Sequence, residues 1–165
     1  MRESIGGAWL LGLMVTFILF FTSFIIVTIN YTRAFRIKNE MLSIIEKFDG
    51  LTSSTTTREG SISVISNFLI RNNQKSTGSC EEGELGAFSL EGPVTFEIVL
   101  DKRAEYYYCV SKHNKFDPNE PNKAYYRVTV FFDFNIPVFG ELFKFSVNGP
   151  TKNVQRPQDV LLWGY

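Results

Sequence analysis

Residues 5–30 read IGGAWLLGLMVTFILFFTSFIIVTIN, which is 26 positions without one charged side chain. A helix of this length reaches about 39 Å, more than the roughly 30 Å of hydrocarbon in a bilayer. Trp9 and Tyr31 lie 22 positions apart, about 33 Å along a helix, which suits two interfacial aromatic anchors. The stretch therefore predicts a transmembrane helix over residues 5–30, with Trp9 and Tyr31 at the two membrane surfaces.

Two other interpretations of this apolar stretch are open. The first is a cleaved signal peptide, which has an apolar region of about 7–15 residues followed by a small-x-small cleavage site. The stretch is longer than that, and it ends in Thr28-Ile29-Asn30, a poor cleavage site. The second is a helix buried in the core of a domain. A retained transmembrane helix explains the length best.

The chain continues from residue 31 as YTRAFRIKNEMLSIIEKFDG, without Pro or Gly before Gly50. Apolar residues repeat at spacings of 3, 4, 3 and 4, and we name them the seam: Ala34, Ile37, Met41, Ile44 and Phe48. Charged residues, Lys38 among them, fill the positions between. This pattern predicts an amphipathic extension of the helix over residues 31–50, ended by Asp49-Gly50. The seam packs either on the chain's own domain or on a partner helix.

A polar linker at 51–60 leads into a domain over residues 61–156, and a short flank (1–4) and a tail (157–165) complete the division. Apolar residues on one helical face predict a short helix from Ser61 to about Arg71. The period then changes to two, with residues 94, 96, 98 and 100 alternating with 95, 97 and 99, and similar alternation over 125–134 and 143–147. With an aromatic strand at 105–112, this predicts an α+β fold: the long helix packed on a small antiparallel sheet of about four strands, with one short extra helix.

Catalytic chemistry and nucleic-acid binding have no support in the sequence. The 17 basic residues balance 17 acidic ones, so there is no basic surface for nucleic acid. His113 is the only histidine; we expect it in an exposed loop, with no base for a nucleophile. Glu81, Glu82 and Glu84 are expected in a solvated turn, and residues 117–122 in a hairpin connection. The sequence predicts no enzyme, no catalytic residue, no cofactor and no metal site.

Cys80 and Cys109 are the whole cysteine content of the chain. In an oxidising compartment they would form a disulfide, which by chain entropy would stabilise the fold by roughly 3–4 kcal/mol. The alternative is a pair of buried free thiols. The side of the membrane is likewise open, because Arg33, Arg36 and Lys38 beyond the apolar stretch favour a cytoplasmic domain, whereas the paired cysteines favour the outside.

A family resemblance bears on that choice. Glu3-Ser4-Ile5-Gly6-Gly7 before the span and Tyr31-Thr32-Arg33-Ala34-Phe35-Arg36 with Asn39-Glu40 after it resemble TadE-like minor pseudopilins of tight-adherence (Tad/Flp) pili. The resemblance implies a pilin-like fold and a single-pass protein of the bacterial cytoplasmic membrane with its domain outside. It also implies a structural or assembly role, in which the partners are the bilayer and other pilin-like subunits or pilus assembly proteins.

This sequence departs from prepilins at one position. Prepilins carry Glu at the fifth mature position. Cleavage after Gly7 would place Gly12 there, cleavage after Gly6 would place Leu11 there, and the span contains no Glu. The sequence therefore lacks the usual Glu contact for entry into a filament core, and the resemblance implies an assembly or tip-type subunit. The alternative from another class is a single-pass sensor or ligand-binding protein whose sheet forms an aromatic pocket from Tyr106–Tyr108, Tyr125 and Phe131.

Overall fold

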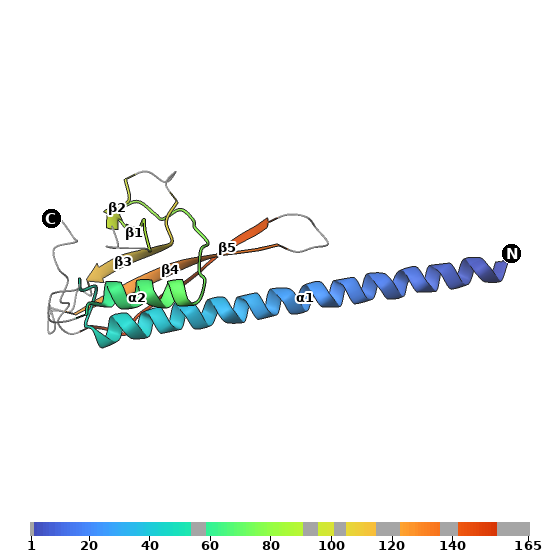
Figure 1. Cartoon of the computed structure of the whole chain (residues 1–165), viewed down its shortest axis with the longest axis horizontal. Helices are drawn as coiled ribbons and strands as arrows, with labels where there is room; N and C mark the ends of the chain where they lie inside the picture. Colours follow the sequence, from blue (N-terminus) through green and yellow to red (C-terminus); the bar gives the residue numbers. More distant parts are fainter. Residues whose placement is uncertain are drawn as a thin grey trace.

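The computed structural model describes residues 2–53, 59–90, 96–100, 105–114, 123–135 and 142–154. They form a long helix, a short helix and an antiparallel sheet (Figure 1), so the predicted α+β class is confirmed. Figure 1 also shows that the N-terminal half of α1 projects far beyond the rest of the molecule. The elements are α1 (Arg2–Lys47), α2 (Ser61–Arg71), β1 (Leu85–Ala87), β2 (Phe96–Ile98), β3 (Tyr108–Asn114), β4 (Ala124–Asn135) and β5 (Leu142–Pro150).

The α1 helix has 46 residues and runs without interruption from the apolar stretch into the domain. Its length is about 69 Å. It ends where the sequence predicts: Gly50 N donates to Ile45 O at 3.0 Å and Asp49 N to Glu46 O at 3.4 Å. These two hydrogen bonds form a Schellman motif, which ends a helix with a residue in the left-handed conformation. That residue is Asp49, with φ of 53°, directly before Gly50.

The sheet order in the described part of the chain is β2-β1-β3-β4-β5, and every neighbouring pair is antiparallel. The β4–β5 pair is the longest, from Arg127 opposite Pro150 to Asn135 opposite Leu142. The strand β1 is absent from the sequence-based expectation. It is three residues long, too short for a two-residue period to reveal it, and it joins β2 to β3.

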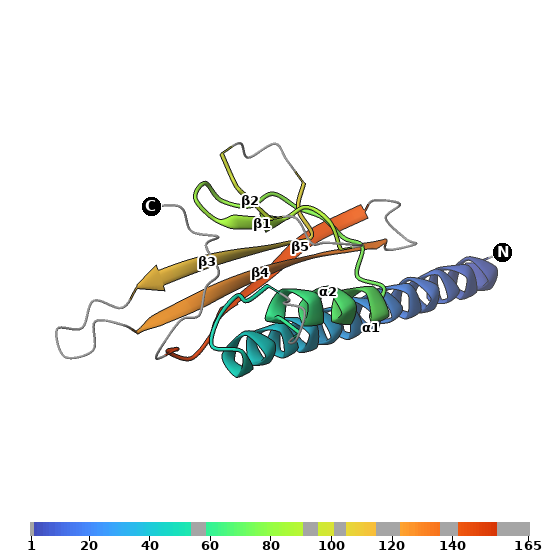
Figure 2. The ribbon, with the colours of Figure 1, turned by 60° about the vertical axis from the view of Figure 1, so that its left-hand side comes forward.

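Both helices lie on one face of the sheet (Figure 2). The strand β4 presents alternate residues to them, and Tyr126, Val128, Val130 and Phe132 are buried in the main core, as the two-residue period predicts. Tyr108 and Val110 of β3 and Val147 of β5 join that core. The seam of α1 packs on β4 and β5.

The opposite face of the sheet carries a second, smaller core of Cys80, Val99, Tyr106, Cys109 and Phe131. The alternation expected for residues 94–100 is wrong at Val99. That pattern predicts Ile98 and Leu100 inward, yet Val99 is fully buried and Leu100 is 83% exposed. Val99 is fixed by its backbone, which donates to Glu84 O at 2.9 Å and accepts from Gly83 N at 3.1 Å, and this holds its side chain against the disulfide cluster.

The linker between the helices is anchored at its two ends. The buried Ser61 hydroxyl donates to Gly50 O at 2.9 Å, and Ser61 N donates to Thr52 Oγ1 at 2.9 Å. These bonds close the chain back on the end of α1, so α2 begins beside the point where α1 stops. Several expected segments lie outside the described residues: the middle of the linker (54–58), residues 94–95, the connections at 117–122 and 136–140, and the tail (157–165).

Candidate functional site

The apolar half of α1 is exposed on all sides. It is long and apolar enough to cross a membrane, and no part of its most apolar window is buried within the described structure. Trp9 is 77% exposed, Leu10 71% and Phe20 71%. The interpretation as a buried core helix is therefore wrong for this segment. Tyr31, the second expected anchor, is 56% exposed and its ring stacks on Phe35 with centroids 6.4 Å apart.

Polar side chains in this half are satisfied by the helix itself. Each Ser and Thr hydroxyl from residue 16 to residue 32 donates to the carbonyl four positions earlier, at 2.7–2.9 Å, and these residues are Thr16, Thr22, Ser23, Thr28 and Thr32. Asn30 Nδ2 makes the same bond to Ile26 O at 2.9 Å. Because hydrocarbon offers no hydrogen-bond partner, this internal pairing lets the segment carry hydroxyls in lipid at low cost.

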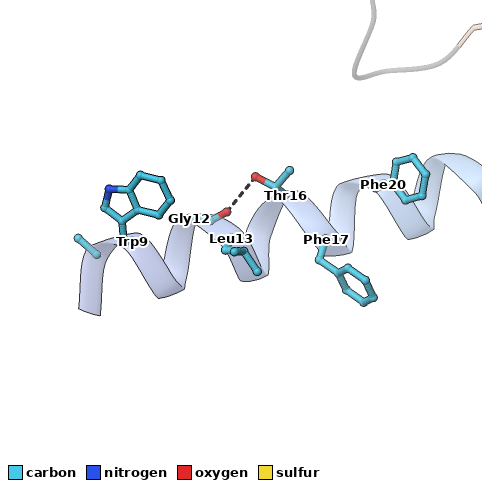
Figure 3. A pocket seen from close by; sticks show the side chains of 7 residues that line it. Trp9, Gly12, Leu13, Thr16, Phe17 and Phe20 are labelled. Atoms are coloured by element: carbon cyan, nitrogen blue, oxygen red, sulfur yellow. Dashed lines mark hydrogen bonds between the residues drawn. The ribbon is translucent and has the colours of Figure 1, made fainter. Parts of the chain in front are cut away.

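A notch in the surface of this half is centred on Gly12 (Figure 3). In the figure Trp9, Thr16 and Phe20 project from one side of the helix and Leu13 and Phe17 from the other. A Cβ added at Gly12 would meet nothing within 4 Å, so the notch is open. Ala8, Gly12 and Thr16 follow one another at intervals of four, the spacing at which small residues let two membrane helices approach closely.

The seam lies in the main core. Ala34, Ile37, Met41 and Ile44 are buried, and Phe48 is half-buried against the same cluster. The chain's own sheet and α2 therefore cover the seam, which the sequence left open between this cover and a partner helix. The buried stripe is also wider than the seam, since it includes Lys38, Leu42 and Ile45.

The expected division of α1 into an apolar and a charged face is wrong for Lys38, which is buried. Its side chain is only 6% exposed. Its Nζ lies 3.9 Å from the centroid of the Phe35 ring, a cation–π contact, and a Cβ on Gly149 of β5 would come 3.0 Å from that Nζ. The long methylene stem packs where α1 crosses the end of the sheet, which a helical wheel cannot reveal.

The predicted disulfide is confirmed: Cys80 and Cys109 are bonded, with Cα atoms 5.7 Å apart, and both are buried. Two glycines make room for the aromatic rings beside it, since a Cβ on Gly78 would collide with Phe131 and one on Gly86 with Tyr106. Among the described residues the one grouping of metal-ligand types is this pair with Glu84. Its sulfurs are bonded to each other, so a single carboxylate remains and the group cannot hold a metal ion.

His113 lies in β3, not in the exposed loop that the sequence predicts. Its ring stacks on Tyr125 of β4, 5.0 Å between centroids, and its Nε2 is 3.2 Å from Ser111 Oγ. Cross-strand pairing of Tyr125 with His113 explains its position. No carboxylate among the described residues completes a catalytic arrangement there. Glu81 and Glu82 are exposed in a turn that Gly83 makes with φ of 84°.

Comparison with known proteins finds no match, either among protein families, among curated proteins or among solved structures.

Proposed function

We propose that this chain is a non-enzymatic, single-pass membrane subunit of a bacterial pilus or secretion system, similar to a pseudopilin, with its α+β domain outside the cytoplasmic membrane. The observation that carries the proposal is the continuity of α1. One helix is bare and apolar for its first half and forms the wall of a folded domain with its second half. This construction places the domain rigidly on its anchor.

The distribution of exposed apolar surface supports an assembly role in the membrane. The seam is already occupied by the chain's own sheet. The outer face of the water-side half is polar and exposed, with Asn39, Glu40 and Ser43 on it. The apolar surface left for a partner helix is that of the span, and the Gly12 notch is where close approach costs least.

The alternative function, a sensor with an aromatic pocket, has less support, because the residues expected to form its pocket lie apart. Tyr108 is buried in the main core under the helices, whereas Tyr106 and Phe131 belong to the second core on the opposite face. Tyr125 is partly exposed and stacks on His113. These side chains do not line one cavity.

The disulfide supports a domain outside the cytoplasm, because structural disulfides persist in oxidising compartments. The positive-inside count over Arg33, Arg36 and Lys38 argues the other way. A reporter active only outside the cytoplasm, fused after Tyr165, should be active. Activity of a cytoplasm-only reporter at that position would reverse the proposed orientation.

Site-specific photo-crosslinking in cells tests the assembly role. A photoreactive side chain replaces Leu13, which lines the notch and is 66% exposed, and the matched control replaces Ser43 on the polar face of the same helix. We expect the probe at residue 13 to capture a second copy or another protein with a single N-terminal membrane helix, and the probe at residue 43 to capture neither. Adducts with lipid alone at residue 13, together with a domain whose melting temperature rises with a small ligand, would favour the sensor.

A further inference from the structure

A cleft of about 830 Å³ lies between α1 and the C-terminal end of α2. From α1 it is lined by residues 28–40 on one side of the helix, and opposite them by Phe68 and Arg71 of α2 and by Asn72 and Asn73 just after it. Its volume falls in the usual range of ligand-binding clefts, about 300–1,000 Å³. Three guanidinium groups, those of Arg33, Arg36 and Arg71, line it together with the single carboxylate of Glu40, which leaves a formal excess of two positive charges.

Two of the three arginines are available to a ligand. Arg33 donates through Nη2 to the carbonyl of Asn72, so it closes the end of α2 and fixes the cleft wall. Arg36 and Arg71 are exposed. Among the described residues, no carboxylate lies within ion-pair distance of either guanidinium. Guanidinium groups bind phosphate through two parallel hydrogen bonds, and these two face the same space.

The cleft changes from apolar to charged along α1. Ile29 lies at its membrane end and is 62% exposed, and Arg36 lies two turns further on. If the span ends near Asn30, Arg33 and Arg36 stand about 4.5 and 9 Å beyond the hydrocarbon. The polar layer of one leaflet is about 5–8 Å thick. The backbone of Arg33 is therefore within the polar layer, and that of Arg36 is about 1 Å beyond it. Because the side chains of a helix lean toward its N-terminus, the Arg36 guanidinium reaches back toward the lipid phosphates, and the apolar end of the cleft is at the level of the acyl chains.

We propose that this cleft binds the headgroup of an anionic phospholipid from the leaflet that α1 enters, with Arg36 and Arg71 on the phosphate and Ile29 beside the acyl chain. The proposal rests on the proposed membrane anchoring of α1. The proposed ligand is a lipid and not a free phosphate ion, because the cleft holds an apolar side chain together with two cations. At that height only a lipid carries both an acyl chain and a phosphate. The bound lipid would brace α2 against α1 at the membrane surface.

The test uses the full chain in a neutral detergent, titrated with phosphatidylglycerol or with phosphatidylcholine, while native mass spectrometry counts bound lipids. We expect phosphatidylglycerol to bind at least tenfold more tightly. In the double variant Arg36→Gln/Arg71→Gln, the affinity for phosphatidylglycerol should fall about fivefold per arginine, which is about 25-fold in all. Arg127→Gln, which removes an exposed arginine on β4, is the control and should leave the preference unchanged.

Equal binding of the two lipids by the parent chain would overturn the proposal, and so would an unchanged preference in the double variant. Displacement of phosphatidylglycerol by an equal concentration of inorganic phosphate would assign the cleft to a free anion instead. The variant Arg36→Lys/Arg71→Lys keeps the charge but loses the paired geometry, and it should fall between the parent and the Gln variant. Carbonate extraction of cell membranes tests the anchoring separately, since a protein released by it would refute the span whatever the lipid measurements give.

Discussion

Met41 offers the most direct test of how α1 supports the domain. Its side chain is fully buried in the main core, at the centre of the seam. Met41→Ala removes most of that side chain and leaves a cavity between α1 and the sheet. Such substitutions at fully buried sites cost about 2–5 kcal/mol. For a domain of this size each kcal/mol lowers the melting temperature by about 4 °C, so the expected decrease is about 8–20 °C.

The measurement is the thermal unfolding of the full chain in detergent, followed by near-ultraviolet circular dichroism of the buried tyrosines. The change in that signal reports mainly the domain, because aromatic side chains in the apolar half of α1, such as Trp9, are exposed and contribute weakly. The control is Ser43→Ala, an exposed position two residues along the same helix, which should melt with the parent or slightly above it. Ile44→Asp should go further and make the domain sensitive to protease, because its charge would be buried without a partner, while the span still inserts.

Equal melting of Met41→Ala and Ser43→Ala would refute the reasoning, since it would mean that the seam does not hold the sheet. If Ile44→Asp also left the domain resistant to protease but abolished crosslinking to partners, the seam would face other subunits. Residues 31–48 would then be an assembly surface, and the cover of the sheet would have to come from elsewhere.

Three further outcomes are expected. Replacing Cys80 and Cys109 together by Ser should cost roughly 3–4 kcal/mol by chain entropy over a sequence separation of 29 residues, and unreduced protein should contain no alkylatable thiol. Gly86→Ala should lower the melting temperature of the domain more than Gly7→Ala, because a Cβ at Gly86 would collide with the Tyr106 ring and a Cβ at Gly7 would meet nothing within 4 Å. Burial raises the pKa of the Tyr108 phenol above its ordinary value of 10. The unfolded chain therefore ionises first, stability falls as pH rises above about 10, and Tyr108→Phe should reduce that alkaline loss in urea titrations.

The long-range periodic patterns in the sequence predict the fold well. The uncharged 26-residue stretch, the seam and the two-residue period of residues 125–134 each extend over several turns or strand positions, so their physical signal accumulates. The α2 boundaries at Ser61 and Arg71 also agree with the structure, because an apolar face and a following Asn72-Asn73 mark both its extent and its end. Asn73 takes the left-handed conformation there, with φ of 51°.

Features set by tertiary contact were not predictable in this way. Val99 is buried on the face opposite to the one its alternation suggests, because the disulfide of Cys80 creates a second core that no local period encodes. Lys38 is buried because α1 crosses β5 at Gly149. The cleft brings Arg71 beside Arg36 from 35 positions away in the sequence, a proximity that no count of charges along the chain reveals.

No Gly or Pro lies between residue 13 and the end of α1 at Lys47, so the apolar half of α1 and the domain keep a fixed rotation relative to each other. Each residue of an α-helix adds about 1.5 Å of rise and about 100° of rotation. The side of the helix on which Gly12 lies therefore fixes the side on which the sheet packs, about 33 Å further along the axis at Ala34. Two chains that pair through their notches would find their domains already turned to one mutual orientation. One alanine inserted between Asn30 and Tyr31 would turn each domain by about 100° without altering either contact surface.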